Sequence, residues 1–225
     1  MDLKLIIKRF MRVWYSSSIF LFIVLSGAMP IETKAITSQV IVDREYLILK
    51  NNFKWLDEHN YNIIKNACNK YKVDIKYACS VIQYESGDYC NNDWFKMTKV
   101  VSRAGAIGPF QIMPFHVKNK NTLYNFEVNA EKGAWYLSLC IEKAKRLKIK
   151  YNSIANKYLN KYKKTGSKKY LNYAKYYYNF KIEKEASRMY NAGLYNKRWK
   201  YKNWSYVNRI YNKYNSVTSS IIAMR

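Results

Sequence analysis

The chain has 225 residues and a mass of 26.9 kDa, which fits one domain or one domain with an appendage, and its 49% apolar content argues against a disordered chain. Forty Lys and Arg against 15 Asp and Glu give a formal charge of +25, which favours an anionic partner such as nucleic acid, an anionic membrane or a cell-wall polymer. A genome rich in Lys, Asn, Ile and Tyr codons would give the same skew, so the charge does not choose the partner. Only 7 Gly and 3 Pro argue against a turn-dense all-β fold and predict an all-α, predominantly helical one.

The N-terminus has the layout of a secretory signal peptide. Basic residues precede an apolar run from Ile19 to Leu25, and small residues that suit cleavage after Ala28 or after Ala35 follow. The apolar run is shorter than the roughly 20 residues that span a bilayer, although residues 13–29 could be kept as an uncleaved anchor. We therefore expect residues 1–35 to be a signal peptide or anchor. The remainder is expected to be exported to the periplasm or cell envelope, or secreted.

Four cysteines are an even number in a chain that is expected to be exported. They permit two disulfides in any of three pairings, and the alternative is four buried thiols that act as small hydrophobes. Their spacing matches no zinc-ligand pattern, and the chain has only two histidines, so no metal site is predicted. The cysteines are Cys68, Cys79, Cys90 and Cys140.

Two short helices are predicted first, after a segment of uncertain structure. Apolar residues at three and four spacing predict a helix over 61–71. Asp74 is a good N-cap for a second helix, which Ser86 and Gly87 end. Residues 102–114 (SRAGAIGPFQIMP) are typical of a structured loop that leads into a short helix.

The second half of the chain is also expected to be helical. Asn129 is predicted to be the N-cap of a long helix that extends to about Leu147. Residues 150–184 are dominated by Lys, Tyr and Asn, and they form either a helical hairpin that turns at residues 165–167 or a repeat without further function. A closing helix carries an apolar stripe from Val207 to Tyr214.

One carboxyl group lies on an otherwise apolar helix face. Glu85 is in register with the apolar residues that follow Asp74, so it is expected to be buried or nearly so. Burial and the negative end of the helix dipole both disfavour the charged form and raise the pKa of Glu85. A carboxyl group that is still protonated near neutral pH is what a general acid requires. The alternative is an ordinary helix-end glutamate that reaches solvent.

Four motifs then carry a resemblance. Their order and character resemble the soluble lytic transglycosylase catalytic domain, a family with a lysozyme-like, goose-type fold. The likeness covers roughly residues 61–148 and 186–214. The motifs are YESGDYC at 84–90, SRAGAIGPFQIMP at 102–114, FEVNAEKGAWYL at 126–137 and MYNAG at 189–193.

The resemblance implies a division of the chain and a set of site residues. Residues 36–60 become an N-terminal extension, 61–215 a catalytic domain with a helical insertion at about 150–184, and 216–225 a C-terminal tail. Glu85 matches the family's single catalytic acid and base. The residues that match the lining of a loop-bordered saccharide groove are Ser102, Gln111, Met113, Tyr190 and Asn191.

The activity implied by the resemblance is cleavage of peptidoglycan. Glu85 would protonate the oxygen of the β-1,4 bond between N-acetylmuramic acid and N-acetylglucosamine, and would then accept the proton of the muramic 6-hydroxyl. The product would be a 1,6-anhydro sugar, formed without water, metal or cofactor. Tyr190 would support Glu85 or the developing charge by hydrogen bonding.

Two departures from the family keep alternatives open. The connection between Glu85 and Ser102 is long, and Asp88 or Asp93 within it could position a water for hydrolysis, as in goose-type lysozymes. The insertion at 150–184 either adds lysines and aromatic rings along an anionic glycan strand or is a solvated helical addition.

The expected partner is therefore the glycan strand of peptidoglycan, together with either wall-turnover, phage-entry or envelope-spanning secretion machinery. A non-catalytic glycan-binding or scaffold protein of the same fold is the main alternative to an enzyme. Nucleic acid is not expected as a partner, because the chain has an export signal and no recognised nucleic-acid motif. Membrane contact is expected only through an uncleaved N-terminal segment.

Overall fold

The computed structural model describes residues 44–194 and 204–223, and these are mostly helical, as predicted. Within them no β-strand is formed, and only isolated bridges join Val101 to Ile107 and Ile107 to Ile112. The elements, in chain order, are a helical segment at 44–52, α3 (Glu58–Tyr71), α4 (Ile75–Ile82), α5 (Trp94–Lys99), short 3-10 turns at Pro114–His116 and Lys120–Tyr124, α6 (Phe126–Thr165), α7 (Lys168–Tyr178), α8 (Ile182–Ala192) and α9 (Trp204–Ala223).

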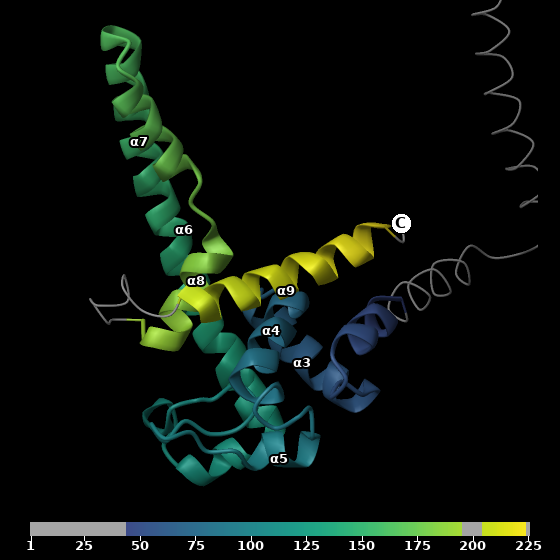
Figure 1. Ribbon diagram of the computed structural model, residues 1–225. Helices are drawn as coiled ribbons and strands as arrows, with labels where there is room; N and C mark the ends of the chain where they lie inside the picture. Colours follow the sequence, from purple (N-terminus) through teal and green to yellow (C-terminus); the bar gives the residue numbers. More distant parts are fainter. Residues whose placement is uncertain (1–43, 195–203, 224–225) are drawn as a thin grey trace, which may run out of the picture. The chain divides into compact units, whose positions relative to one another are not determined.

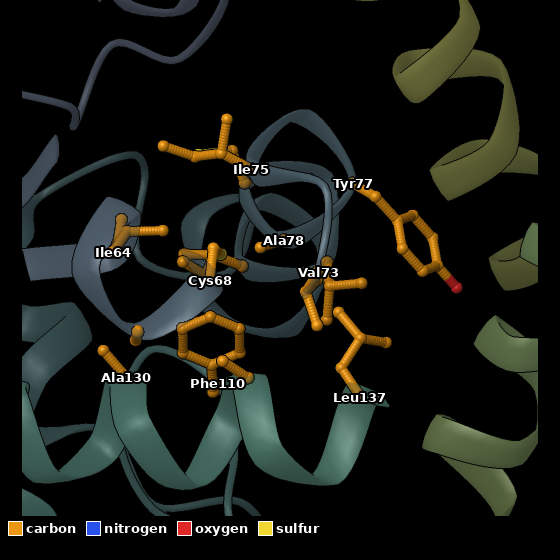
Figure 2. Close-up of a cluster of buried hydrophobic side chains, with 14 of the residues drawn as sticks. Ile64, Cys68, Val73, Ile75, Tyr77, Ala78, Phe110, Ala130 and Leu137 are labelled. Atoms are coloured by element: carbon orange, nitrogen blue, oxygen red, sulfur yellow. The ribbon is translucent and has the colours of Figure 1, made fainter. Parts of the chain in front are cut away.

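The core forms where α3, α4 and α6 meet. Figure 2 shows Cys68 from α3, Ala78 from α4 and Leu137 from α6 together with Phe110 from the loop at 102–114. Leu137, Ala78 and Phe110 are fully buried. Burial of this apolar surface is the main stabilising contribution, and it fixes the loop against the helices.

The two short helices begin at aspartate caps. Asp57 accepts a hydrogen bond from the backbone N–H of Asn60, and Asp74, the predicted cap, accepts one from Lys76. Each carboxylate satisfies a backbone donor that would otherwise lack an intrahelical partner. The prediction for the start of α4 is confirmed.

The start of α6 differs from the prediction. The helix begins at Phe126, and Asn125 is its N-cap, accepting from the backbone N–H of Val128. Asn129 was the predicted cap, but it lies inside the helix, fully buried, and its side chain bonds to the loop instead. Both asparagines fit the capping pattern. Asn129 is not the cap because its side chain is used to bind the loop at 102–114.

The insertion forms the helical hairpin that was one of the two predicted alternatives. α6 continues without a break to Thr165, and α7 runs back alongside its second half (Figure 1). The turn closes at Gly166, whose φ of +67° lies in the left-handed region that glycine occupies readily. Stacked tyrosine rings line the hairpin, including Tyr158 and Tyr177 at 6.0 Å.

All four cysteines are buried free thiols, which is the second of the two predicted alternatives. Burial raises the pKa of Cys68 to about 12, so its thiolate is scarce at neutral pH. The cysteines therefore act as small apolar residues of the core.

Several predictions concern the ends of the chain. The signal peptide or anchor at 1–35 lies outside the described residues. Within the part that the structure does describe, no helix is both long enough and apolar enough to cross a bilayer. The segment at 45–56 contributes Leu49, Phe53 and Leu56 to the core, and α9 extends to Ala223, through most of the predicted tail.

Candidate active site

Glu85 lies on a widened helical turn at the end of α4. Residues Gln83–Gly87 form a π-helical turn in which the backbone N–H of Asp88 bonds to the carbonyl of Gln83 at 2.8 Å. Such turns are rare, and many occur at functional sites. The hydroxyl group of Ser86 donates to the carbonyl of Pro109 at 3.0 Å, which ties the turn to the loop at 102–114.

A buried glutamine holds the far side of the same turn. Gln83 accepts a hydrogen bond from the indole N–H of Trp55 at 2.9 Å, and its amide donates to Asp88 at 2.7 Å and to Asn92 at 2.9 Å. Asp88 is thereby used to fix the turn that positions Glu85.

A cavity of about 450 Å³ opens beside Glu85. All six site residues that the sequence predicted line it, although they come from three separate segments of the chain. Its lining residues are Glu85, Ser102, Ala104, Ala106, Gln111, Ile112, Met113, Phe115, His116, Tyr136, Tyr190, Asn191, Ala192 and Gly193. Neither Asp88 nor Asp93 is among them, so Glu85 is the one carboxyl group among these lining residues.

Asn129 fixes the loop that forms one wall of the cavity. Its side chain donates to the carbonyls of Ile107 and Leu123 and accepts from the backbone N–H of Phe110, over 2.8 to 3.2 Å. Gly108 has a φ of +78°, and a Cβ there would lie 2.4 Å from the Asn129 amide nitrogen. Only glycine therefore fits this position without moving the loop.

The predicted groove residues on the loop also support its shape. Gln111 has a positive φ of 49°, and its amide donates to the carbonyl of Gly108 at 2.8 Å. The hydroxyl of Ser102 accepts from the backbone N–H of Ala106 at 3.0 Å. Both side chains thus line the cavity and hold the loop in the conformation that forms it.

Two tyrosines lie near Glu85, and they have different partners. Tyr206 on α9 donates a hydrogen bond to the carboxyl group of Glu85. Tyr190 on α8 instead donates to the carbonyl of Phe110 at 2.7 Å, so the bond that the resemblance suggested for Tyr190 is made by Tyr206 in this structure. Burial raises the pKa of Glu85 to about 7, and the bond from Tyr206 partly offsets this rise.

Sequence reasoning did not assign Tyr206, Tyr136 or His116 to the site. Tyr206 is one of 23 tyrosines, and nothing in its local pattern marks it. His116 is one of the two histidines of the chain, which were weighed from the sequence only as metal ligands. It packs against the ring of Tyr136 at 4.8 Å, and burial, helped by the charge of Lys132, lowers its pKa. The side chain is therefore neutral at pH 7 and can donate or accept one hydrogen bond toward the cavity.

The arrangement provides one protonatable carboxyl group, a neutral imidazole, aromatic rings and amide groups around an open cavity. Among the described residues no cluster of His, Cys, Asp and Glu could hold a metal ion. No family model matches the chain, and no curated protein or solved structure gives a significant match.

Proposed function

We propose that the chain is a lytic transglycosylase that cleaves peptidoglycan and uses Glu85 as its single acid and base. The observation that carries this proposal is the meeting of all six motif residues around one cavity, with a carboxyl group whose pKa is about 7. Residues drawn from motifs more than 100 positions apart in sequence would have no reason to converge if the motifs were accidental matches. A lysozyme-like arrangement of the helices is part of the same proposal.

The first step requires a protonated acid. With a pKa near 7, about half of the Glu85 side chains carry a proton at neutral pH. Glu85 gives this proton to the glycosidic oxygen as the bond to the anomeric carbon breaks. The hydrogen bond from Tyr206 then stabilises the carboxylate that is left.

The second step returns the proton. The Glu85 carboxylate accepts the proton of the muramic 6-hydroxyl as that oxygen attacks its own anomeric carbon. The bond formed replaces the bond broken, the enzyme recovers its starting state, and the product is a 1,6-anhydro ring. A hydrolytic glycosidase generally needs a second carboxyl group, and among the described residues that line this cavity only Glu85 carries one.

The rest of the cavity suits a sugar chain. Phe115 at the rim has 75% of its surface exposed, and the partly exposed ring of Tyr136 also lines the cavity, so both can contact sugar faces. Gln111 and Asn191 supply amides that can bond to hydroxyl and acetamido groups. These features support the proposal that the cavity binds an amino-sugar polymer.

The test is mass spectrometry of the products released when the purified protein is incubated with peptidoglycan sacculi. We expect muropeptides that are lighter than the hydrolytic products by one water, about 18 Da. Glu85→Gln should reduce their release by about 10²- to 10⁴-fold. Glu58→Gln, at an exposed carboxyl group in the first turn of α3, is the matched control and should retain full activity.

Other outcomes would redirect the assignment. Products with free reducing ends would mean hydrolysis, and Asp88→Asn and Asp93→Asn would then be tested for loss of activity. Equal product release by wild type and Glu85→Gln would remove Glu85 from the mechanism. Binding to sacculi without any product would favour the non-catalytic glycan-binding alternative.

A further inference from the structure

A second pocket lies where the hairpin meets α8 and α9. It has a volume of about 420 Å³, and none of its lining residues lines the cavity of Glu85. We call it the hairpin-base pocket. The residues used below are Tyr151, Tyr176, Lys181, Glu185, Arg188 and Trp204.

Aromatic rings form its walls. The ring of Tyr151 packs edge-on against Phe180 at 5.0 Å, which holds one wall rigid. Tyr176 has 74% of its surface exposed. Trp204 is 48% exposed, and the guanidinium of Arg188 lies over its ring at 4.9 Å, which leaves part of the ring open to a ligand. Large exposed rings beside a pocket suit a ligand that stacks on them, such as a sugar or a nucleobase.

A buried ion pair lies at the same pocket. Glu185 accepts a hydrogen bond from Arg188 through Oε1 at 3.1 Å, and the two residues are only 8% and 5% exposed. The other carboxylate oxygen of Glu185, Oε2, is buried and has no hydrogen-bond partner among the described residues. Burial without a donor is unfavourable, so this oxygen is an acceptor that a ligand hydroxyl or N–H group would satisfy.

The charges around the pocket restrict the ligand further. Lys181, Lys184 and Arg188 outnumber the single carboxylate of Glu185, which disfavours a cationic ligand. Glu185 in turn disfavours a bare phosphate at the position of its free oxygen. Together, the aromatic rings, the unpaired oxygen of Glu185 and the lysines fit a ligand of a particular kind. Such a ligand has hydroxyl or amide donors, a face that stacks on rings and a carboxylate that reaches the lysines.

We propose that the hairpin-base pocket binds an amino sugar of a glycan strand together with the carboxylate of its peptide substituent, at a site separate from Glu85. That the glycan is peptidoglycan rests on the proposed function. α8 contributes Glu185 and Arg188 to this pocket and Tyr190 and Asn191 to the cavity, so one strand held at the pocket raises the local concentration of strand at the cavity.

The experiment is an NMR titration of the full chain carrying Glu85→Gln with N-acetylmuramyl-L-alanyl-D-isoglutamine. The reporter is the indole N–H signal of Trp204, assigned by its absence in Trp204→Phe. We expect a saturable shift of this signal, and a weaker one with chitotetraose, which lacks a carboxylate.

Two substitutions at the pocket test the contacts. Tyr176→Ala should weaken binding about fivefold, the effect of one lost ring contact. Lys181→Gln should weaken it by a similar, salt-dependent factor of about three to five.

Matched controls lie on the same hairpin. Tyr173 and Lys175 are exposed residues of α7 that do not line the pocket, so Tyr173→Ala and Lys175→Gln should leave the titration unchanged. Because all four substitutions are at exposed positions, they are expected to leave the fold intact.

Three results would overturn the proposal. The first is an unchanged Trp204 signal at saturating ligand, and the second is equal weakening by the pocket and control substitutions. The third is a shift caused by a single-stranded oligonucleotide and lost in Tyr176→Ala, which would assign the pocket to nucleic acid. Sacculus cleavage requires the chemistry of Glu85, whereas the Trp204 signal reports binding alone. A chain that binds at Trp204 without cleaving would therefore retain the pocket and lose the proposed function.

Discussion

The hydroxyl group of Tyr206 donates a hydrogen bond to the carboxyl group of Glu85, 121 residues earlier in the chain. α9 therefore supplies a hydrogen-bond donor to Glu85, which follows the end of α4. Burial raises the pKa of Glu85, and this bond, which favours the charged form, opposes the rise. The balance leaves the pKa close to 7, where both protonation states are available.

Substitution of Tyr206 by Phe should move the pH profile of cleavage. Without the donor the charged form of Glu85 is less stable, so its pKa rises. The basic limb of the profile should shift upward by about one pH unit, because a hydrogen bond to a charged group contributes about 1.5 kcal/mol. The measurement is the rate of muropeptide release between pH 5 and 9, with each variant compared with wild type.

Tyr211→Phe is the control for this experiment, since Tyr211 lies on the same helix but is not the tyrosine that bonds to Glu85. A profile of Tyr206→Phe that overlays the wild-type curve would show that the hydroxyl does not set the protonation of Glu85.

The raised pKa of Glu85 also predicts a pH dependence of stability. From pH 4.5 to about 7 the folded protein holds the Glu85 proton while the unfolded chain loses it. The free energy of unfolding therefore falls as pH rises through this window, with the contribution of Glu85 complete below pH 4.5 and lost above 7. In Glu85→Gln, urea unfolding should show a shallower decline over the same range, whereas Glu58→Gln should follow wild type. Parallel curves for Glu85→Gln and wild type would contradict the shift.

The helical class of the fold and the places of several helices could be predicted from sequence because both depend on local signals. Apolar spacing located α3 and α4, Asp74 was recognised as a cap, and Gly166 marked the turn of the hairpin. The start of α6 was missed because Asn125 and Asn129 are equally good caps. The difference is that Asn129 bonds to the backbone of Ile107 and Phe110 in the loop and to the carbonyl of Leu123 in the turn at 120–124, a tertiary requirement that no local pattern records.

The residues of the candidate site also differ in whether the sequence alone could reveal them. Glu85 could be found because a carboxyl group on an apolar stripe breaks the pattern of its own helix. Tyr206 could not, since its role depends on how α9 packs against α4 and on a contact between residues 121 positions apart. The free state of the cysteines was equally beyond the sequence, because their number fits two disulfides as well as four buried thiols.

Removal of the Asn129 side chain should destabilise the cavity wall. Asn129→Ala leaves the backbone N–H of Phe110 and the carbonyl of Ile107 buried without these partners, which we expect to cost about 3 kcal/mol. Urea unfolding measures this loss. Asn119→Ala removes a single exposed hydrogen bond and should cost less than about 1 kcal/mol. Similar costs for the two variants would show that Asn129 does not fix the loop.

The approach of the loop to α6 depends on the absence of a side chain at Gly133. A Cβ there would lie 2.2 to 2.6 Å from ring atoms of Phe110, which is fully buried and has little room to move. Alanine favours helices over glycine, yet Gly133→Ala should lower the free energy of unfolding by about 1 to 3 kcal/mol, because overpacking outweighs helix propensity. Phe110→Leu relieves the overlap, so the double variant should lose less stability than the sum of the two single variants. Additive losses would mean that the ring and the helix backbone are not in contact, and that the cavity wall is held by Asn129 without help from this packing.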